Sequence, residues 1–398
     1  MRVSTANRYA SSIDALQSRQ RALTDAQIQM TSGKRVNKPS DDPTAAARAE
    51  RAYIAQQRIG SEQRSVDASR NAMTLAESAV GQANDVLQSA REAVVASGNG
   101  SYSPGERAAK AAQLQQYRDQ LMSLANQSNG AGGFLFGGQG ASAMPFLDTP
   151  AGVTAAATGG QTQLSSTEQM PITVDGAAIW LGVPSGNGVF DSSAAASNTG
   201  SGWVDAGSVT DPSAVTGANY QIVFAGSGAG SSYSVLKDGL PTAQANRPYA
   251  AGAVLTVDGM SAHIKGAPAN GDSFSLAPSS PSLNAFRALD AVIAVLKNPS
   301  ANTGHIGQAV NSGLRDIDAV MSRMQAAQAE AGSAMNRLDA IDNRNQDRTL
   351  WAKSVQSDAE DLDMVQAISD FKNQETGYQA ALQSYASVQR LSLFDYIK

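Results

Sequence analysis

Residue types that commonly carry chemistry are scarce in this chain. Its 398 residues include two histidines, His263 and His305, and no cysteine. Without cysteine the chain has no thiolate nucleophile, no disulfide and no cysteine-containing metal site. A Ser–His–acid triad would have to use one of the two histidines, and no Gly-x-Ser-x-Gly turn between a strand and a helix accompanies either. These residues therefore do not predict a catalytic site.

Two further clusters have simpler interpretations than chemistry. An acidic group at Asp358, Glu360, Asp361 and Asp363 lacks the spacing of a calcium-binding loop and is typical of a solvated helix face. The glycine-rich run 226–230 lacks the lysine of a phosphate-binding loop and predicts a turn. The sequence thus predicts a protein that is not an enzyme and that needs no cofactor or metal.

Composition and charge exclude several other classes of protein. The formal net charge of −5 is too mild to suggest nucleic-acid binding. No stretch approaches the roughly 20 apolar residues of a membrane span, and the first residues lack the apolar core of a secretory signal. Residues 1–60 hold ten Arg and Lys against five acidic residues, and residues 351–398 hold four against seven. The two ends are opposite in sign, which favours their pairing, although each exposed charge contributes little.

The N-terminal segment predicts a helix with a narrow apolar seam. Its large apolar residues recur at seven-residue steps, with one intervening position, as in a coiled coil: Tyr9, Leu16, Leu23 and Met30, and between them Ile13. Gln20 and Gln27 fall on the same seam, which predicts a helix that depends on a partner. The helix is expected to stop at Gly33. The basic link 34–38 that follows is expected to pair with acidic residues on a neighbouring element.

A long second helix is expected from Pro43 to about Ala96. Asp42 can cap it, and proline suits the first helical position. One seam carries a large apolar residue every seven residues without a break: Ile59, Val66, Met73, Val80, Leu87 and Val94. Alanines at 76, 83 and 90 alternate with three of these, a pattern for close packing of helices. The length predicted for this helix suits a fibrous assembly.

A third helix and a short strand follow. Ser103 and Glu106 form a capping box with proline at the first position. The helix after it spaces its apolar residues three and four apart: Leu114, Tyr117, Leu121 and Leu124. Residues 132–138, bracketed by glycine pairs, predict a short apolar strand that covers the end of a core.

Residues 141–280 predict an inserted β-rich domain, either a sandwich or a small barrel. Alternating apolar residues replace helical spacing there, and Asp258-Gly259 is a favourable hairpin turn. Segments 151–168 and 191–202 are expected to be loops.

Helical spacing returns at Pro281 and continues to the C-terminus. A second long helix is expected after Thr303, with a polar joint around Asn343 to Arg348. The final segment carries aromatic residues at seven-residue steps with two aliphatic residues between them: Phe371, Tyr378 and Tyr385, and Ile368 and Leu382. These five residues and the five apolar residues of the N-terminal seam form the predicted assembly seam.

The predicted fold is α plus inserted β, with long coiled-coil-like helices from both termini and a β-rich outer domain. Five segments are expected: an N-terminal half of an inner coiled-coil domain (1–40), a first helical half (41–140), the β insertion (141–280), a second helical half (281–350) and the C-terminal half of the inner domain (351–398).

Three motifs in this order resemble the flagellin superfamily and, within it, the hook-associated junction proteins. They are the signature at 30–43 (MTSGKRVNKPSDDP), the glycine-bracketed apolar run at 133–138 (GFLFGG) and the C-terminal run at 391–397 (LSLFDYI). The resemblance covers both helical halves and says little about 141–280.

The resemblance implies a structural component of the bacterial flagellum that connects the hook to the filament. It implies that the termini form an inner coiled-coil layer and the insertion an outer lobe. It also implies export through the flagellar type III system to an extracellular place at the hook–filament junction. The implied partners are other hook-associated proteins, flagellin, further copies of this chain in a ring, and a cytoplasmic export chaperone.

Two alternatives remain open at this point. The chain could be a flagellin, which would polymerise alone into long filaments. It could also be a secreted adhesin whose β lobe binds carbohydrate, with a sugar platform lined by Trp180, Trp203, Tyr220 and Tyr233, although core packing is the usual role of aromatic residues on alternating strands.

Overall fold

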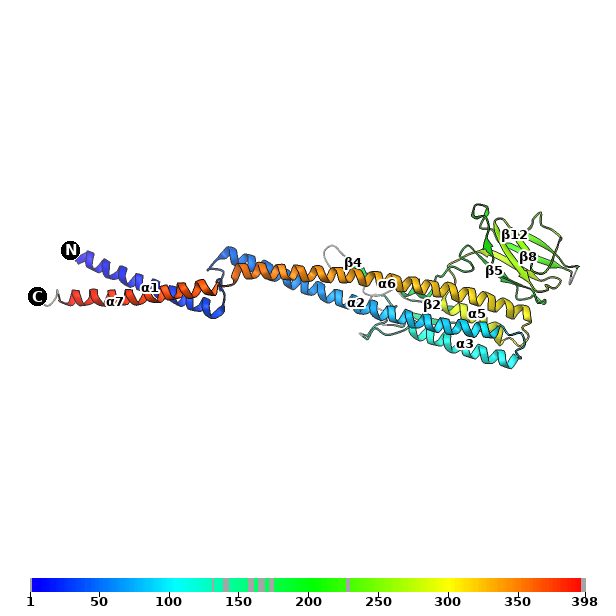
Figure 1. Cartoon of the computed structure of the whole chain (residues 1–398), viewed down its shortest axis with the longest axis horizontal. Coiled ribbons are helices and arrows are strands. Elements are labelled where there is room, and N and C mark those ends of the chain that lie inside the picture. Colours follow the sequence, from blue (N-terminus) through cyan, green and yellow to red (C-terminus); the bar gives the residue numbers. More distant parts are fainter. Residues whose placement is uncertain are drawn as a thin grey trace. The chain divides into compact units, whose positions relative to one another are not determined.

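The computed structural model describes residues 2–130, 132–138, 143–156, 161–163, 169–171, 175–226 and 230–394, with side chains left out at 2–9, 161–163, 169–171 and 388–394. The chain divides into two compact units (Figure 1). Unit 1 comprises residues 1–64 and 340–398, and unit 2 comprises residues 65–339.

Helices dominate both ends of the sequence. Their bounds are α1 Arg2–Ser32, α2 Pro43–Ser97, α3 Pro104–Ala125, α4 Gly176–Trp180, α5 Ala285–Lys297, α6 Thr303–Glu360 and α7 Met364–Phe394, with a short 3-10 turn, η1, at Pro212–Ala214. The fold class expected from the sequence, long terminal helices with a β-rich insertion, is confirmed.

The strands all lie between α3 and α5 in the sequence. Their bounds are β1 Phe146–Thr149, β2 Gly152–Ala155, β3 Gln161–Gln163, β4 Gln169–Pro171, β5 Phe190–Ala194, β6 Trp203–Val204, β7 Ser208–Val209, β8 Tyr220–Ala225, β9 Ser232–Lys237, β10 Leu240–Pro241, β11 Arg247–Pro248, β12 Val254–Val257, β13 Met260–Lys265 and β14 Ser273–Pro278. Strands β1 and β2 form one hairpin, and β3 and β4 another.

Local chemistry sets the helix boundaries as expected. Gly33 ends α1 at φ +70, a conformation that glycine adopts without strain. The Asp42 carboxylate accepts hydrogen bonds from the backbone N–H groups of Thr44 and Ala45 at 3.1 and 3.0 Å and so caps α2. The capping box of Ser103 and Glu106 is present at the start of α3.

In unit 1, the first turns of α2 and the last turns of α6 pair through alanines and a polar layer. Asn345 is 3% exposed, and its side-chain amide donates to the Gln63 side chain at 3.3 Å. Arg348 pairs with Glu62 at 2.8 Å. The sequence predicts a joint around 343–348, but the helix does not break there. Helix α6 continues to Glu360, and the chain turns only at 361–363.

The helical core of unit 2 is built from α2, α3, α5 and α6. The heptad residues of α2 from Val66 to Val94 are at most 2% exposed, as their spacing predicts. Burial of one such side chain stabilises a fold by about 1.5–3 kcal/mol. Helices α3 and α5 pack against each other, and α5 begins at Ala285, after its cap Asn284, rather than at Pro281.

An aromatic cluster closes one end of this core. Trp180 of α4 is fully buried between Phe136 and Phe286, at ring-centroid distances of 5.5 and 6.0 Å. Residues 132–138 form isolated bridges instead of the predicted strand, and Gly176 permits the approach of Phe136, because a Cβ there would lie 2.5 Å from the Phe136 backbone oxygen. The run therefore covers the core as a turn.

Arg118 of α3 ties three elements together beside that cluster. Its guanidinium pairs with Asp148 of β1 at 2.7 Å and with Asp290 of α5. The Arg118 side chain is 8% exposed, so burial strengthens these charge-assisted hydrogen bonds.

The β lobe has its own core, formed from β5 to β14. One sheet runs in the order β10-β9-β8-β14-β5, with β11 pairing β9, and another runs β12-β13-β6, with β7 pairing β13. Asp258 and Gly259 join β12 to β13 at φ +40 and +77, the turn that the sequence predicts. Segments 151–168 and 191–202, expected as loops, contain β2, β3 and most of β5.

The β lobe rests on the start of α6. Val204 donates its backbone N–H to the Gln308 side chain at 2.9 Å, and Arg315 pairs with Asp191 at 2.8 Å. A Cβ at Gly304 would lie 2.8 Å from the backbone oxygen of Gly200. The close approach of the two backbones thus depends on glycine.

Candidate assembly interface of the terminal helices

Helices α1 and α7 lie side by side in unit 1, with the N- and C-termini at the same end of the pair (Figure 1). The other ends of the two helices are joined by short contacts. Leu362 donates its backbone N–H to the Gly33 oxygen at 2.9 Å, and Arg35 donates to the Glu360 oxygen at 2.7 Å. The Lys34 ammonium pairs with the Glu360 carboxylate at 2.9 Å. The basic link 34–38 therefore has the acidic partner that its sequence predicts.

Six of the ten predicted assembly-seam residues are half-buried in the structure: Leu16, Leu23, Met30, Phe371, Tyr378 and Tyr385. Their spacing of seven residues keeps them on one stripe of each helix. The Arg19 guanidinium of α1 lies against Gly377 of α7, in the space that a Cβ at this position would occupy. The sequence pattern did not identify this pair.

The other four seam residues are placed differently. Ile13, Ile368 and Leu382 are 37%, 48% and 42% exposed, so the pairing of α1 with α7 leaves them uncovered. Tyr9 lies in α1, and its side chain is outside the described residues. Gln20 and Gln27, which share the predicted seam, are exposed.

Pairing of α1 with α7 leaves both helices incompletely covered. Among their described side chains, at 10–32 and 364–387, none is buried. By contrast, the much shorter α5 buries Phe286, Leu289, Val292, Ile293 and Leu296. Isolated helices gain most of their stability from the packing of an apolar face. The α1–α7 pair therefore lacks a core of its own.

Exposed apolar side chains extend over the rest of unit 1. Beyond the seam, the exposed large hydrophobic residues are Ile28, Tyr53, Ile54, Leu350, Trp351, Met364 and Val365. Val365 is 83% exposed and Trp351 is 68% exposed. Apolar surface that is not buried within a chain commonly marks an interface with another protein. The predicted seam did not include these residues. Met364 continues the seven-residue spacing of Phe371, Tyr378 and Tyr385 and could have been found from it, whereas Val365 and Trp351 lie off that spacing.

The link between α1 and α2 is held by charge. Arg35 pairs with Asp42 at 3.1 Å. The pKa of Asp42 lies below its usual range, because the carboxylate accepts the backbone N–H of Ala45 and, second, the Arg35 guanidinium. Asp42 is therefore charged at neutral pH and holds the link and the helix cap together.

Elsewhere, the described residues do not bring together the side chains of a catalytic or metal site. His263 pairs with Asp205 at 2.8 Å, and the His305 Nε2 atom is buried without a hydrogen-bond partner within the described part of the chain. In those same residues, no group of three or more acidic or histidine side chains is arranged to hold a metal ion, and no helix is long and apolar enough to cross a membrane.

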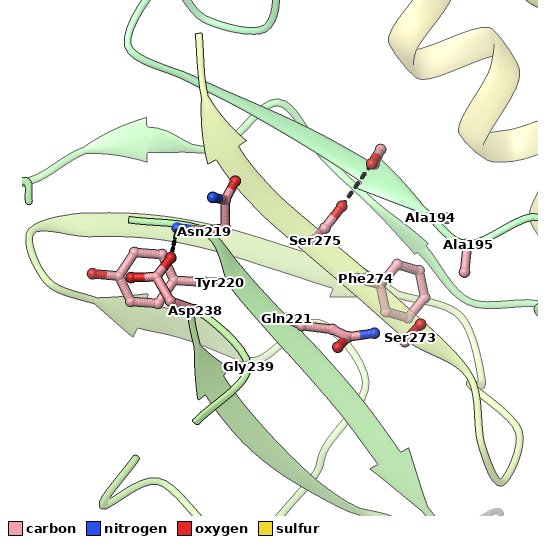
Figure 2. A pocket seen from close by; sticks show the side chains of 11 residues that line it. Ala194, Ala195, Asn219, Tyr220, Gln221, Asp238, Gly239, Ser273, Phe274 and Ser275 are labelled. Carbon is pink, nitrogen blue, oxygen red and sulfur yellow. Dashed lines mark hydrogen bonds between the residues drawn. The ribbon is translucent and has the colours of Figure 1, made fainter. Parts of the chain in front are cut away.

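The four aromatic residues considered for a sugar platform are not brought together on one surface, although Trp203 and Tyr233 are half-buried and not fully buried. Trp180 lies in the helical core, and Tyr220 is 1% exposed. A hollow of about 540 Å³ on this lobe is lined by polar side chains such as Asn219, Gln221 and Asp238 (Figure 2). The two rings beside it, Tyr220 and Phe274, are buried, so no ring face is available for stacking.

Comparisons with known proteins agree with the architecture. The profile of the bacterial flagellin N-terminal helical region matches residues 3–141, and that of the D2-like domain of flagellar hook-associated protein 1 matches residues 193–278. With paired terminal helices and an inserted lobe, the chain resembles the flagellin class of flagellar proteins.

Relatives refine this assignment. Flagellar hook-associated protein 3 of Salmonella typhimurium is 25% identical over 398 residues, 99% of each chain. The crystal structure of FlgL from Xanthomonas campestris has a TM-score of 0.69 at 28% identity, over 78% of this chain and 99% of that one. The flagellar junction protein FlgL of Legionella pneumophila has a TM-score of 0.66 at 25% identity, over 79% and 100%. Within that class, the chain is similar over nearly its whole length to flagellar hook-associated protein 3.

Proposed function

We propose that this chain is a structural component of the bacterial flagellum that joins the hook to the filament. The relatives named hook-associated protein 3 and flagellar junction protein support this role. The observation that carries it is the α1–α7 pair, which has no buried side chain among its described residues and exposes Ile13, Ile368 and Leu382. Two helices that pair without a core are completed when neighbouring subunits cover them.

The ten residues of the assembly seam have a defined part in this proposal. The half-buried stripe aligns α1 against α7, and the exposed apolar residues contact adjacent subunits. The partners would be other hook-associated proteins, flagellin and further copies of this chain in a ring. The place of such a protein is the flagellum, and we propose export through the type III system with a cytoplasmic chaperone. The role is structural, so no catalytic step belongs to it.

Deletion of the gene in the source bacterium tests the proposal. We expect hooks without filaments, and flagellin released into the medium, because filament subunits would have no adaptor on which to assemble. The intact gene should restore filaments. Normal filaments in the deletion strain would contradict the junction role.

Complementation with Ile368→Asp sharpens the test. Ile368 is 48% exposed, so the charge should leave the free chain folded but should prevent filament assembly by forcing a carboxylate into an apolar contact. Val254→Asp is the matched control, because Val254 is 55% exposed in the β lobe. Filaments counted by electron microscopy should be lost with Ile368→Asp and retained with Val254→Asp. Equal numbers of filaments with the two variants would show that this face of α7 is not part of the assembly interface.

A further inference from the structure

Four asparagines in this chain are directly followed by glycine: Asn99, Asn129, Asn187 and Asn270. Asparagine is a chemically labile residue. Glycine has no Cβ, so the backbone nitrogen of a following glycine can approach the carbonyl carbon of the asparagine side chain closely. Attack by that nitrogen closes a succinimide ring and releases ammonia. All four sequences permit this reaction, so the surrounding structure decides which asparagine reacts first.

At three of the four sites the attacking nitrogen is held by a hydrogen bond. The backbone N–H groups of Gly188 and Gly271 donate to backbone oxygens at 3.3 and 2.9 Å. The backbone N–H of Gly130 donates to the Ser128 hydroxyl at 3.2 Å. Each of these bonds must open before the nitrogen can attack, which slows the reaction.

The side chains of the same three asparagines are also held. The Oδ1 atoms of Asn129 and Asn270 each accept a backbone N–H at 3.0 Å. The Oδ1 atom of Asn187 accepts two, at 3.1 and 3.0 Å, and its Nδ2 atom donates to two further backbone oxygens. These amide groups cannot turn toward the glycine nitrogen without losing hydrogen bonds.

Asn99 is in a different environment. It lies in the turn between α2 and α3, where residues 98–101 are all exposed. Among the residues that the structure describes, the backbone N–H of Gly100 has no acceptor. The Oδ1 atom of Asn99 accepts one hydrogen bond, from the backbone N–H of Ser101 at 3.1 Å. A Cβ at Gly100 would meet nothing within 4 Å, so the space around the attacking nitrogen is open.

We propose that Asn99 is a site of spontaneous chemical modification in the folded chain and that it reacts before the other three asparagines. The deprotonated backbone nitrogen of Gly100 attacks the side-chain carbonyl carbon of Asn99. A new C–N bond forms there, and the bond to the side-chain nitrogen breaks. The leaving nitrogen takes up one proton, which balances the proton lost from Gly100, and departs as ammonia. Water then opens the succinimide at either carbonyl, which gives aspartate or isoaspartate at position 99.

The reaction changes the turn in two ways. Either product places a carboxylate just beyond the C-terminal end of α2, where the helix dipole disfavours negative charge. Isoaspartate also adds a methylene to the backbone, which displaces the Asn99 backbone oxygen from the Tyr102 N–H that it accepts at 3.2 Å. We therefore expect the modified turn to open more readily. This site lies outside the assembly seam, and the inference does not depend on the proposed function.

Peptide mapping by mass spectrometry tests the proposal. The folded, full-length chain is incubated in mildly alkaline buffer, and the deamidated fraction at each of the four asparagines is followed with time. We expect Asn99 to convert about tenfold faster than the other three, because further hydrogen bonds must open at each of those sites. In the chain unfolded in guanidinium chloride, the four rates should converge. A folded chain in which Asn99 is not the fastest, or an equal lead of Asn99 in the unfolded chain, would overturn the proposal.

A pair of glycine variants tests the attacking atom. A Cβ at Gly100 or at Gly105 would meet nothing within 4 Å, so Gly100→Ala and the control Gly105→Ala should both fold, which circular dichroism verifies. Gly100→Ala should slow the conversion of Asn99 about tenfold, because the added methyl group hinders the approach of the nitrogen. Gly105→Ala should leave the rate unchanged. Equal rates of Asn99 conversion in the two variants would contradict attack by the Gly100 nitrogen.

Discussion

At the scale of single residues, Arg118 is a nearly buried cation that joins α3 to β1 and α5 in unit 2. It pairs with Asp148 and Asp290 while only 8% exposed. We expect Arg118→Met to reduce the free energy of unfolding by about 1–3 kcal/mol, since both carboxylates stay half-solvated when the cation is removed. Urea unfolding near neutral pH measures this, with the exposed Arg287→Met as the control. Equal midpoints for the two variants would contradict it.

The stabilisation that the Arg118–Asp148 ion pair provides depends on pH, and the direction of this dependence can be derived. Hydrogen bonds from Arg118 hold the pKa of Asp148 below its usual range, against the opposing effect of partial burial. A lowered pKa in the folded chain means that this stabilisation is present above the usual carboxyl pKa and is lost as pH falls through the lowered value. The stability difference between the unsubstituted chain and Arg118→Met should therefore shrink below about pH 4.

Two glycines of α6 provide a matched comparison. A Cβ at Gly304 would lie 2.8 Å from the Gly200 oxygen and 2.9 Å from the Gly202 oxygen, whereas a Cβ at Gly332 would meet nothing within 4 Å. Gly332→Ala should stabilise the chain by about 0.5–1 kcal/mol, because glycine is a poor helix former. Gly304→Ala should destabilise it by about 1–3 kcal/mol, because backbone atoms cannot yield. If the melting temperatures of both variants shifted in the same direction relative to the unsubstituted chain, the result would be inconsistent with this packing.

At the scale of elements, the terminal helices should be the least protected segments of the free chain. The α1–α7 pair has no buried side chain among its described residues, so local opening costs little free energy. Limited proteolysis of the monomer should first cut within residues 1–40 and 355–398. The helical core of unit 2 is the internal control and should persist. Full protection of both ends in a proven monomer would count against this.

Periodicity predicted the elements well where one face of a helix is buried. The heptad from Val66 to Val94 is buried as its spacing requires, and the cap at Asp42 lies where the sequence places it. The sequence predicted a joint at 343–348, before the turn that the structure has at 361–363. The reason is that polar residues such as Asn345 and Arg348 are unusual on an apolar seam. In the structure their polar groups bond across to Gln63 and Glu62, so tertiary partners override the local pattern.

At the scale of the whole molecule, the sequence predicted two helical halves around a β-rich insertion, but two aromatic residues within 141–280 pack elsewhere than in the β lobe. Phe146 and Trp180 were expected in the β lobe, and both belong to the helical core of unit 2. Aromatic residues in short, glycine-rich segments carry no periodic signal that assigns them to one core or another. The five-segment division remains a prediction beside the two compact units of the structure.

The sequence identified only part of the candidate assembly interface. Spacing selected the stripe from Leu16 to Met30, because a helix pair buries one stripe. It did not select Val365 or Trp351, since both lie off the seven-residue spacing.

The polar layer of unit 1 has a consequence for how α2 and α6 find their alignment. Asn345 and Gln63 lie 282 positions apart, so the intervening chain is too long to dictate how far one helix slides along the other. Alanine meets alanine almost equally well after a shift of one heptad. A shifted pair would lose the hydrogen bond from the Asn345 amide to Gln63 and would separate Arg348 from Glu62. The buried Asn345 amide N–H would then lack an acceptor, at a cost of about 1–3 kcal/mol. The polar layer therefore favours one alignment of α2 with α6, and we expect the unfolded chain to regain that alignment when it refolds.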